Sequence, residues 1–392
     1  LETLVDFGPQ PVTNRFLPSA DAPEYRHPIV LGQCPDCALL QLLDSPPARE
    51  LVPIHDWITY NEPEPHLDAL ADQLMRLGLE KNAQTLGVSF KDESLLARLE
   101  RRGCAKGRVL DMQGDLGITT TGAGVEAVQN QLTPQKAAEL AARYGRARLV
   151  VARQILEHSF DLPGFLEALT RLAAPGGLIA IEIPDCESSF DKSDCCAIWE
   201  EHVVYFSEPT YRACLARAGL ELVHFQRAPY PMEDSLVAVV RATGRPGAPL
   251  SAEARGAELS RGRRFAAGIA ARERALRETL AEFGKDGPVA LLGAGHLSCA
   301  FRNFQKLEGL ISFVADDHPK KKGLFMPGSR LPILPSEALL DRGVKFCLLG
   351  VNPNSENAVL ERQRAFLERG GRIASIFPAS PRALKTGEVE TR

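Results

Sequence analysis

The sequence alternates short apolar segments with amphipathic ones, and this alternation is its strongest constraint on the fold. Six segments predict buried strands, at residues 83–90, 107–112, 147–156, 176–184, 220–228 and 235–242. Helical periodicity lies before and between them, at 66–79, 92–103, 161–173 and 208–218. Because no helix separates the last two strands, we expect a mostly parallel sheet with an antiparallel edge pair.

The same alternation starts again near the end of the chain. After the linker "TGRPGAPLS", an Ala/Glu/Arg-rich stretch predicts one long helix over 252–284. Strands are then predicted at 287–295, 310–317, 344–351 and 371–378. Residues 24–45 before the first unit read as two short strands joined by a Cys-Pro-Asp-Cys turn. We therefore expect three domains, at 1–66, 67–243 and 244–392.

Charge and cysteine usage narrow the class of protein. The net charge is only -4, and acids and bases are interspersed, so neither a nucleic-acid nor a membrane partner is expected. No apolar run approaches the roughly 20 residues that a membrane helix needs, and the first residues show no signal peptide. The nine scattered cysteines do not suggest a disulfide framework, which favours a cytoplasmic protein.

A ligand of the first unit is expected where its parallel strands end. Gly87 closes the first strand, Asp111 lies 24 positions later, and Ala152 to Gln154 end a third strand beside the same crevice. A carboxylate at this spacing suits the two hydroxyls of a ribose. The loop has no GxGxxG pattern, however, and a Rossmann-like unit without a cofactor is the alternative.

The second unit repeats this arrangement. Gly293, Gly295 and His296 lie between a strand and a helix, where a backbone can approach a phosphate. Asp317 follows Gly293 by 24 positions, at the end of the next strand. Lysines 320–322 could neutralise a diphosphate, although such a run is more often a solvated loop. We favour a ligand site here over a bare scaffold.

The stretch "IWEEHVVYFSEPT", residues 198–210, places two carboxylates directly before His202. It fits either a solvated charge cluster or a general base beside its orienting partners. His158, in "QILEHSFDL", fits the start of a helix equally well and receives no catalytic role.

Together these features resemble the sugar C-methyltransferases of deoxysugar biosynthesis. The matching segments cover nearly the whole chain: 7–16, 34–42, 150–169, 176–185, 200–207 and 316–333. The resemblance implies a class I methyltransferase Rossmann-like core, a small N-terminal zinc-ribbon-like segment and a second Rossmann-like domain at the C-terminus. It also implies S-adenosylmethionine as cofactor, and antibiotic biosynthesis as a setting.

The resemblance also implies roles for individual residues. His202 would be the catalytic base and Glu201 its partner, although Trp199 and Glu200 stand where the family usually has Tyr and His. Gly87, Asp92, Asp111, Ala152 and Gln154 would contact the cofactor. Tyr60, Glu62 and His66 would face the sugar, and Gly293, Gly295, His296 and Asp317 would help to hold the nucleotide.

Departures from the family pattern leave a second function open. The loop 87–93 lacks the second glycine of the family's Gly-Ser-Asn-Asp-Gly loop. The alternative is therefore a nucleotide-sugar-binding or sugar-modifying protein that has lost methyl transfer. A monomer or homodimer is expected in either case.

Zinc is only weakly supported by the sequence. The family binds zinc through two Cys-x-x-Cys pairs, and this sequence contains one, Cys34 and Cys37. His27 and His55 are possible substitutes for the other ligands. A reduced cysteine pair in a turn is the favoured interpretation, because structural zinc nearly always has four protein ligands.

Overall fold

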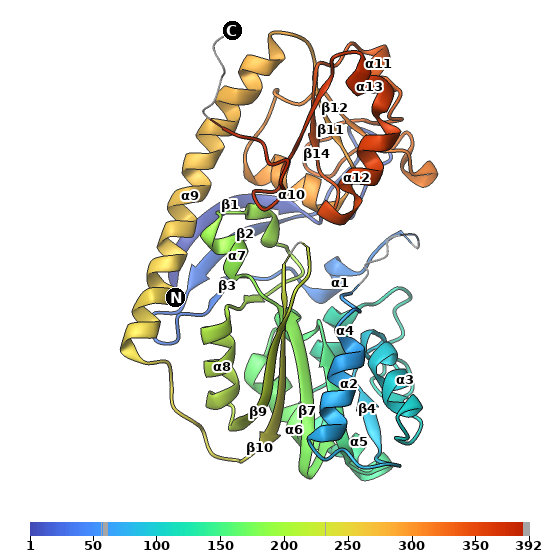
Figure 1. Cartoon of the computed structure of the whole chain (residues 1–392), viewed down its shortest axis with the longest axis vertical. Helices are drawn as coiled ribbons and strands as arrows, with labels where there is room; N and C mark the ends of the chain where they lie inside the picture. The colour runs from blue at the N-terminus through green and yellow to red at the C-terminus, as the bar shows by residue number, and fades with distance from the viewer. Residues whose placement is uncertain (56, 58–61, 232, 387–392) are drawn as a thin grey trace. The chain divides into compact units, whose positions relative to one another are not determined.

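The computed structural model describes residues 1–55, 57, 62–231 and 233–386. The chain folds into two compact units (Figure 1). The first unit contains Leu1–Glu2, Gly32–Glu187 and Glu201–Leu259, and the second contains Thr3–Leu31, Ser188–Glu200 and Ser260–Arg392. The N-terminal segment is thus shared between the units.

The first unit is built on a six-stranded sheet with the order β5-β4-β6-β7-β10-β9. Its strands are β4 (Thr85–Gly87), β5 (Arg108–Val109), β6 (Ala147–Arg153), β7 (Ala173–Pro184), β9 (Leu220–Ala228) and β10 (Ser235–Ala242). The strands β5, β4, β6 and β7 are parallel, whereas β10 runs antiparallel to both β7 and β9. The predicted antiparallel edge pair is confirmed.

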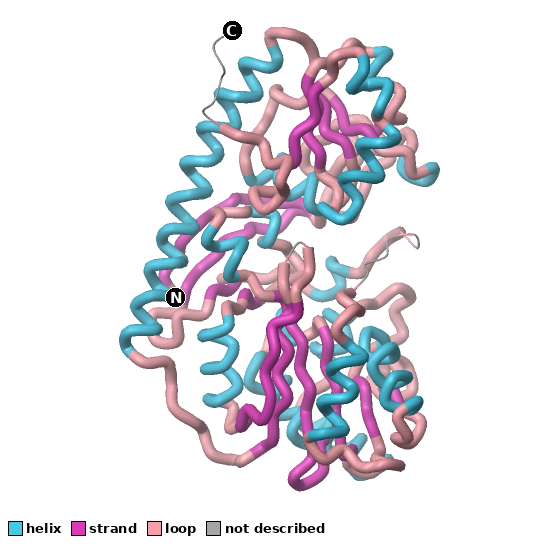
Figure 2. The backbone as a smooth tube through the Cα atoms, in the orientation of Figure 1, coloured by secondary structure: helices cyan, strands magenta, loops and turns pink. Residues whose placement is uncertain are grey.

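Helices cover both faces of this sheet, as Figure 2 shows in cyan and magenta. The unit contains α1 (Ala48–Leu51), α2 (Leu67–Arg76), α3 (Glu93–Arg101), α4 (Val125–Gln131), α5 (Pro134–Tyr144), α6 (Leu162–Leu172) and α8 (Glu208–Arg217). It also contains the short turns η1 (Phe90–Asp92) and η2 (Leu156–His158), and the antiparallel pair β3 (Leu40–Leu42) and β8 (Val204–Tyr205).

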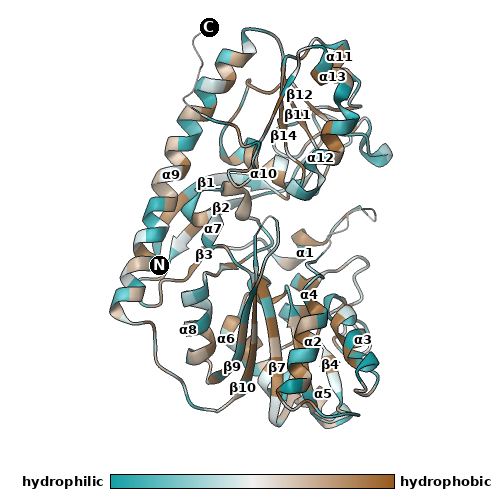
Figure 3. Ribbon diagram, in the orientation of Figure 1, coloured by the Kyte–Doolittle hydropathy of each residue, from teal (hydrophilic) through white to brown (hydrophobic). Residues whose placement is uncertain are grey.

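The sheet of the first unit lies between two layers of helices, and the alternation of side chains along its strands explains this arrangement. Leu178 and Ala180 of β7 pack with leucines of α2 and α3, whereas Ile179 and Ile181 pack with α4, α5, α6 and α8. Successive side chains of a strand point to opposite faces, so a strand between two helical layers is apolar at every position. Figure 3 shows this as the brown colour of β7 and β10.

The second unit has a five-stranded parallel sheet with the order β13-β12-β11-β14-β15. Its strands are β11 (Val289–Leu292), β12 (Phe313–Ala315), β13 (Ile333–Leu334), β14 (Phe346–Leu349) and β15 (Arg372–Ser375). Its helices are α10 (His296–Phe304), α11 (Ala338–Asp341), α12 (Pro353–Arg362) and α13 (Arg364–Glu368), with the turns η3 (Cys195–Ala197) and η4 (Pro319–Lys321).

Four of the described elements continue from one unit into the other. They are β1 (Glu2–Pro11), β2 (Arg26–Gln33), α7 (Glu187–Asp191) and the 33-residue helix α9 (Ala252–Gly284), which confirms the predicted long helix. β1 pairs with β2, and Phe7 of β1 stacks on Phe304 of α10 with 4.2 Å between ring centroids. The second unit therefore includes most of the N-terminal strands in its own packing.

Among the described helices, none combines the length and the apolar character that crossing a membrane requires.

Candidate active site

The strand order of the first sheet reverses between β4 and β6. From β4 the chain first forms β5 on one side of β4, and it then crosses to form β6 on the other side. Ligands of doubly wound sheets bind outside the carboxyl ends of the strands at such a point. Here those ends are Gly87 and Arg153. The loops after these two residues define the candidate site.

Asp92 ties the two loops together. Its carboxylate accepts hydrogen bonds from the amides of Val88 (2.8 Å), Ser89 (3.0 Å) and Arg153 (2.9 Å), and its side chain is fully buried. Burial raises the pKa of Asp92 to about 7, against the lowering effect of these amides. Asp92 thus lies at the predicted cofactor crevice, and the structure gives it an internal role.

Gly87 is needed for the same contact. A Cβ atom at this position would lie 2.7 Å from the Cβ of Asp92 and 3.1 Å from a methyl group of Leu96. Real Cβ atoms essentially never approach this closely. The glycine therefore makes room for the Asp92 side chain.

Lys91 places an ammonium group in the same loop. Its Nζ lies 2.8 Å from Oε1 of Glu62 and donates a hydrogen bond of 3.0 Å to the carbonyl of Gln154. Burial alone would lower the pKa of Lys91, but the carboxylates of Glu62, Glu157 and Glu126 hold it above its usual value. The loop therefore carries a permanent positive charge, whose ion-pair partner is the predicted sugar-binding residue Glu62.

Asp111 keeps the position predicted for a ribose ligand. It follows the end of β5, its side chain is exposed, and one carboxylate oxygen accepts a hydrogen bond of 2.5 Å from the amide of Gly114. Ala152 is fully buried. Gln154 is buried with φ of 48°, a left-handed conformation that is strained for a residue other than glycine and that often marks functional sites.

His66 belongs to a buried ion network below the site. Its Nε2 atom lies 3.2 Å from Oε1 of Glu182, and the other oxygen of Glu182 accepts a hydrogen bond of 2.6 Å from Arg153. Burial alone would raise the pKa of Glu182, but His66 and Arg153 hold it below its usual value. The carboxylate of Glu182 therefore engages His66, which was predicted to face the sugar. Tyr60 lies outside the described residues.

His202 lies in a cluster with Glu157 and His158. A nitrogen of each imidazole and an oxygen of Glu157 all lie within 4.8 Å of one another. The two rings meet edge to face, with 4.7 Å between centroids and 85° between planes. A backbone hydrogen bond of 2.7 Å from Val203 to the carbonyl of Glu157 links the two segments.

Two carboxylates surround His158. Its Nδ1 lies 3.1 Å from Oε1 of Glu126, and its Nε2 lies 3.7 Å from Oε1 of Glu157. Burial alone would raise the pKa of Glu126, but the adjacent His158 holds it below its usual value. Burial raises the pKa of Glu157 to about 7, although His158 and Lys91 oppose this. Such a group can exchange a proton with an imidazole near neutral pH.

The structure places the acidic partner of His202 elsewhere than in the adjacent sequence. Glu201 is buried, and its predicted orienting role stays a prediction. Glu157, by contrast, is grouped with His202 in space but lies 45 positions away. Glu157 and Glu126 were missed, and His158 was left unassigned. The signal that could have found Glu157 and His158 is the Glu-His pair shortly after β6, where ligands of such sheets bind, whereas Glu126 lies in α4 and carries no such signal.

The glycine loop of the second unit is also tied by charged side chains. Asp316 accepts a hydrogen bond of 2.8 Å from the amide of Ala294 and lies 3.0 Å from Nζ of Lys321, which donates to the carbonyl of Ala294 at 2.6 Å. Gly293 has φ of 104°, and a Cβ atom there would lie 2.7 Å from Val351. A Cβ atom at Gly295 would have no atom within 4 Å, so space is open at the start of α10.

His296, at the same helix start, stacks on Trp199 with 4.7 Å between ring centroids. Burial, with Lys321 nearby, lowers the pKa of His296 to about 4, so its ring is neutral at neutral pH. Asp317 accepts two hydrogen bonds from Ser336, at 2.8 and 2.9 Å. Its carboxylate thus holds the loop before α11, and its predicted contact with a nucleotide stays a prediction.

Glu200, which precedes Glu201 in sequence, faces into the second unit. One of its carboxylate oxygens accepts hydrogen bonds from the amide (2.5 Å) and the hydroxyl (2.8 Å) of Thr13. The indole of Trp199 donates to the same hydroxyl at 3.2 Å. Burial raises the pKa of Glu200 to about 7.

The Cys34–Cys37 turn offers two zinc ligands. Burial alone would raise the pKa of Cys34, but the amides of Cys37 and Asp36 hold it below its usual value, as suits a metal-binding thiolate. Burial raises the pKa of Cys37, which is less suited to bind a metal as a thiolate. Within the described ranges, however, neither His27 nor His55 joins the pair in a group of three close ligands. Zinc needs about four, so these residues do not complete a site.

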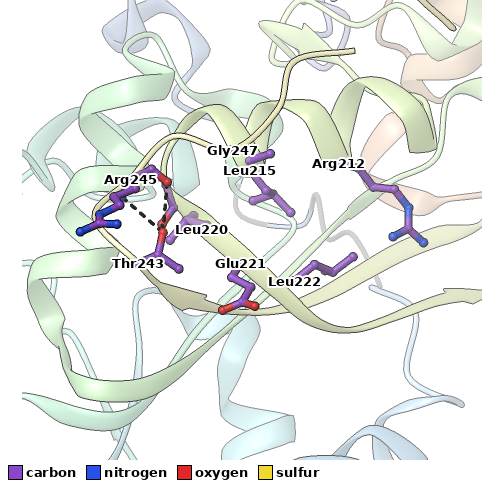
Figure 4. Close-up of a pocket in the computed structure, with 10 residues that line it drawn as sticks. Arg212, Leu215, Leu220, Glu221, Leu222, Thr243, Arg245 and Gly247 are labelled. Carbon is purple, nitrogen blue, oxygen red and sulfur yellow. Dashed lines mark hydrogen bonds between the residues drawn. The ribbon is translucent and has the colours of Figure 1, made fainter. Parts of the chain in front are cut away.

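A shallow pocket of about 380 Å³ lies on the first unit beside α8, lined by Leu215, Leu220, Leu222 and Thr243 among others (Figure 4). Its lining comes from the end of α8, the start of β9 and the segment after β10. None of the predicted site residues lines it.

Comparison with known proteins gives matches along most of the chain. Three family models match: "C-methyltransferase C-terminal domain" over residues 250–378, "Methyltransferase domain" over 68–225, and "Putative zinc binding domain" over 1–51. C-methyltransferase NovU of Streptomyces niveus is 30% identical over 273 residues, which is 67% of this chain and 64% of NovU. The chain therefore spans slightly less than two thirds of that relative's length.

Solved methyltransferase structures share less sequence identity with this chain. The 1,6-didemethyltoxoflavin-N1-methyltransferase of Burkholderia thailandensis is 15% identical, with a TM-score of 0.30 over 48% of this chain and 97% of its own. The N-methyltransferase NodS of Bradyrhizobium japonicum WM9 is 16% identical, with a TM-score of 0.30 over 46% of this chain and 99% of its own.

Proposed function

Because this chain belongs to the C-methyltransferase family, we propose that it transfers a methyl group from S-adenosylmethionine to carbon. The proposed acceptor is a carbon next to the ketone of a nucleotide-linked keto-deoxysugar. The observation that carries the proposal is the grouping of Glu157, His158 and His202 within 4.8 Å, just beyond the carboxyl edge of the first sheet. Two imidazoles and a carboxylate are suited to removing a proton from carbon.

His202 is the proposed base. A proton next to a ketone is acidified by the carbonyl group, and a neutral imidazole with a reference pKa of about 6.5 can accept it at physiological pH. Glu157, with its pKa raised to about 7, lies beside both rings and can take the proton onward. Glu126 supports His158 from its far side, at 3.1 Å from Nδ1.

The residues at the strand ends fit the cofactor in part. The exposed carboxylate of Asp111 suits its ribose hydroxyls, and the ammonium group of Lys91 suits its carboxylate. The amides of Val88 and Ser89 are occupied by Asp92 and are not assigned to it. When bound, S-adenosylmethionine supplies an electrophilic methyl group.

We assign the nucleotide of the substrate to the second unit, because this unit offers a helix start for an anion and an aromatic surface. The open space at Gly295 lies at the N-terminus of the nine-residue helix α10, whose amides favour an anion. Trp199 provides an aromatic surface next to His296. These features support nucleotide-diphosphate binding over a bare scaffold.

Replacing His202 tests the proposed base. We expect His202→Asn to lower methyl transfer to a panel of nucleotide-linked keto-deoxysugars by about 10²- to 10⁴-fold. Exchange of the substrate carbon-bound proton in D₂O should slow equally, while S-adenosylhomocysteine affinity changes little. His224→Asn is the matched control, because His224 lies on β9 and bonds to Gln226. Undiminished transfer by the His202 variant would remove this residue as the base.

The second candidate is a nucleotide-sugar-binding protein without methyl transfer. The observation that favours it is the occupation of the Val88 and Ser89 amides by Asp92. Calorimetry with S-adenosylhomocysteine separates the two candidates. Binding supports the methyltransferase, whereas binding of a nucleotide sugar alone supports the second candidate.

A further inference from the structure

We propose that Glu157, His158 and His202 also form a binding site for a divalent transition-metal ion of the zinc class. One ligand atom from each residue lies within 4.8 Å of the others. Two histidines and one carboxylate are an established ligand set for zinc and for iron(II), and they leave further positions open for water. Metal binding here does not depend on the proposed methyl transfer.

The orientation of His158 supports this site. Its Nδ1 lies 3.1 Å from Oε1 of Glu126, within ion-pair distance but without hydrogen-bond geometry, and its Nε2 lies 3.7 Å from Oε1 of Glu157. Metal-bound histidines almost always use one ring nitrogen for the metal and give the other to a carboxylate or carbonyl group. Glu126 thus lies on the Nδ1 side of the ring, where the outer partner of a ligand would lie, and Nε2 lies on the side of Glu157.

Glu157 provides a second, independent observation. Its side chain is 2% exposed, and in the part of the chain that the structure describes its Oε2 atom has no hydrogen-bond partner. A buried carboxylate oxygen without a partner is costly, and buried charges are usually paired or coordinate metals. A bound cation would satisfy this oxygen.

The segments that carry the ligands are held together before any ion binds. The amide of Val203 donates a 2.7 Å hydrogen bond to the carbonyl of Glu157, so the residue after His202 is tied to the residue before His158. Such prior fixing of ligands favours metal binding.

The cluster already has one cation beside it. The ammonium group of Lys91 pairs with Glu62 at 2.8 Å, and Glu157 and Glu126 also attract it. A bound divalent ion would therefore share the three carboxylates of Glu62, Glu126 and Glu157 with Lys91. Since a bound ion would occupy the imidazole lone pair of His202, it would also inhibit proton removal, and this consequence rests on the proposed function.

Two cysteine-containing groups are competing metal sites, and the test must separate them from the histidine cluster. They are the Cys34–Cys37 turn and the buried group Asp194, Cys195 and Cys196 of the second unit. Both would bind through sulfur, whereas the proposed site has only nitrogen and oxygen donors. Cobalt(II) distinguishes them, because thiolate ligands add intense charge-transfer bands in the near ultraviolet.

The experiment is a cobalt(II) titration of the full chain after chelation, without cofactor or substrate, with metal content measured after dialysis against zinc. We expect one ion per chain with visible d–d bands and no thiolate charge transfer. His158→Asn and Glu157→Gln should each abolish these bands. Glu126→Gln, which changes only the outer partner, should weaken binding about 10- to 100-fold. His224→Asn should bind as the unchanged protein does.

Several results would overturn the proposal. These are no binding, binding with thiolate charge transfer alone, or unchanged binding in both Glu157→Gln and His158→Asn. Thermal unfolding of each variant establishes that it is folded; if His158→Asn does not fold, Glu157→Gln and Glu126→Gln decide. Because the titration involves no methyl transfer, a protein that binds cobalt as expected but fails the calorimetry with S-adenosylhomocysteine would retain this site and lose the proposed function.

Discussion

The two glycine loops, after β4 in the first unit and after β11 in the second, look alike in sequence and differ in structure. Each begins at the end of a central parallel strand, and in each an acidic residue lies 24 positions after the first glycine. At Gly87 the missing side chain leaves room for Asp92 of the same loop. At Gly295 no atom lies within 4 Å of the position of a Cβ atom.

This difference shows that a glycine in such a loop can have either of two structural roles. It can allow the chain to pack against itself, as Gly87 does, or it can leave the space beside the backbone open, as Gly295 does. The first loop then offers a ligand mainly the side chain of Lys91, together with Asp111 from the loop after β5. The second offers a helix start with open space. The predictions below test this contrast, beginning with the largest expected effect.

Replacing Asp92 in the first loop and Asp316 in the second should lower the free energy of unfolding of the two units by unequal amounts. Asp92→Ala removes the side-chain acceptor of the Ser89 and Arg153 amides in a fully buried place, while the Val88 amide keeps its bond of 3.1 Å to the carbonyl of Val151. Asp316, by contrast, is partly exposed. An unsatisfied buried group costs about 1–3 kcal/mol. We expect Asp92→Ala to lower the free energy of unfolding by about 3–5 kcal/mol and Asp316→Ala by about 1–2 kcal/mol. Hydrogen exchange in urea, followed in peptides of each unit, measures both, and equal losses would contradict the contrast.

The alternation of apolar segments was enough to predict all six strands of the first sheet and four of the five strands of the second, whereas the two-residue strand β13 was missed. The strands β6, β7, β9 and β10 are long or strongly apolar, and the absence of a helix before β10 gave the antiparallel pair. The sequence could not show that β1 and most of β2 pack within the second unit, because the stacking of Phe7 on Phe304 joins residues almost 300 positions apart.

The candidate site was predicted less completely. Position at a strand end indicated Asp111 and the loop after Gly87, since topology alone brings strand ends together. The grouping of His202 with Glu157 depends on how the segment before β8 lies against η2, which no local pattern encodes. Likewise, adjacent Glu200 and Glu201 read as one charge cluster, whereas Glu200 faces Thr13 of the second unit.

Stability of the second unit should fall as the pH rises, because of Glu200. Its folded pKa of about 7 exceeds the ordinary 4.5, so between these values the folded state holds a proton that the unfolded state has lost. This contribution is fully present below about pH 4.5 and is lost as the pH rises through 7. The difference of about 2.5 in pKa corresponds to at most about 3 kcal/mol. Glu200→Gln should flatten the dependence in exchange measurements on the second unit, and an unchanged slope would contradict this.

Adding one methyl group to each glycine tests the contrast directly. Gly87→Ala places a Cβ atom 2.7 Å from that of Asp92, so we expect a loss of about 1–3 kcal/mol in the free energy of unfolding of the first unit. Gly295→Ala meets no atom within 4 Å and should change stability by less than about 0.5 kcal/mol. It should instead weaken nucleotide-sugar binding, measured by calorimetry. The contrast fails if Gly295→Ala unfolds the second unit as readily as Gly87→Ala unfolds the first.

The smallest expected effect concerns whether the first loop still serves a ligand. Lys91→Met removes the ammonium group that pairs with Glu62, and Lys81→Met is the control, because Lys81 is exposed elsewhere in the same unit. If Lys91 binds the cofactor's carboxylate, losing one charge-assisted contact should weaken S-adenosylhomocysteine binding about tenfold, or about 1.4 kcal/mol. The variant also leaves Glu62 without its ion pair to Lys91, and repulsion between Glu62 and the ligand's carboxylate would add to the loss. If calorimetry shows tighter binding instead, Lys91 occupies the space of the cofactor. In that case both Lys91 and Asp92 would exclude a ligand from the first loop.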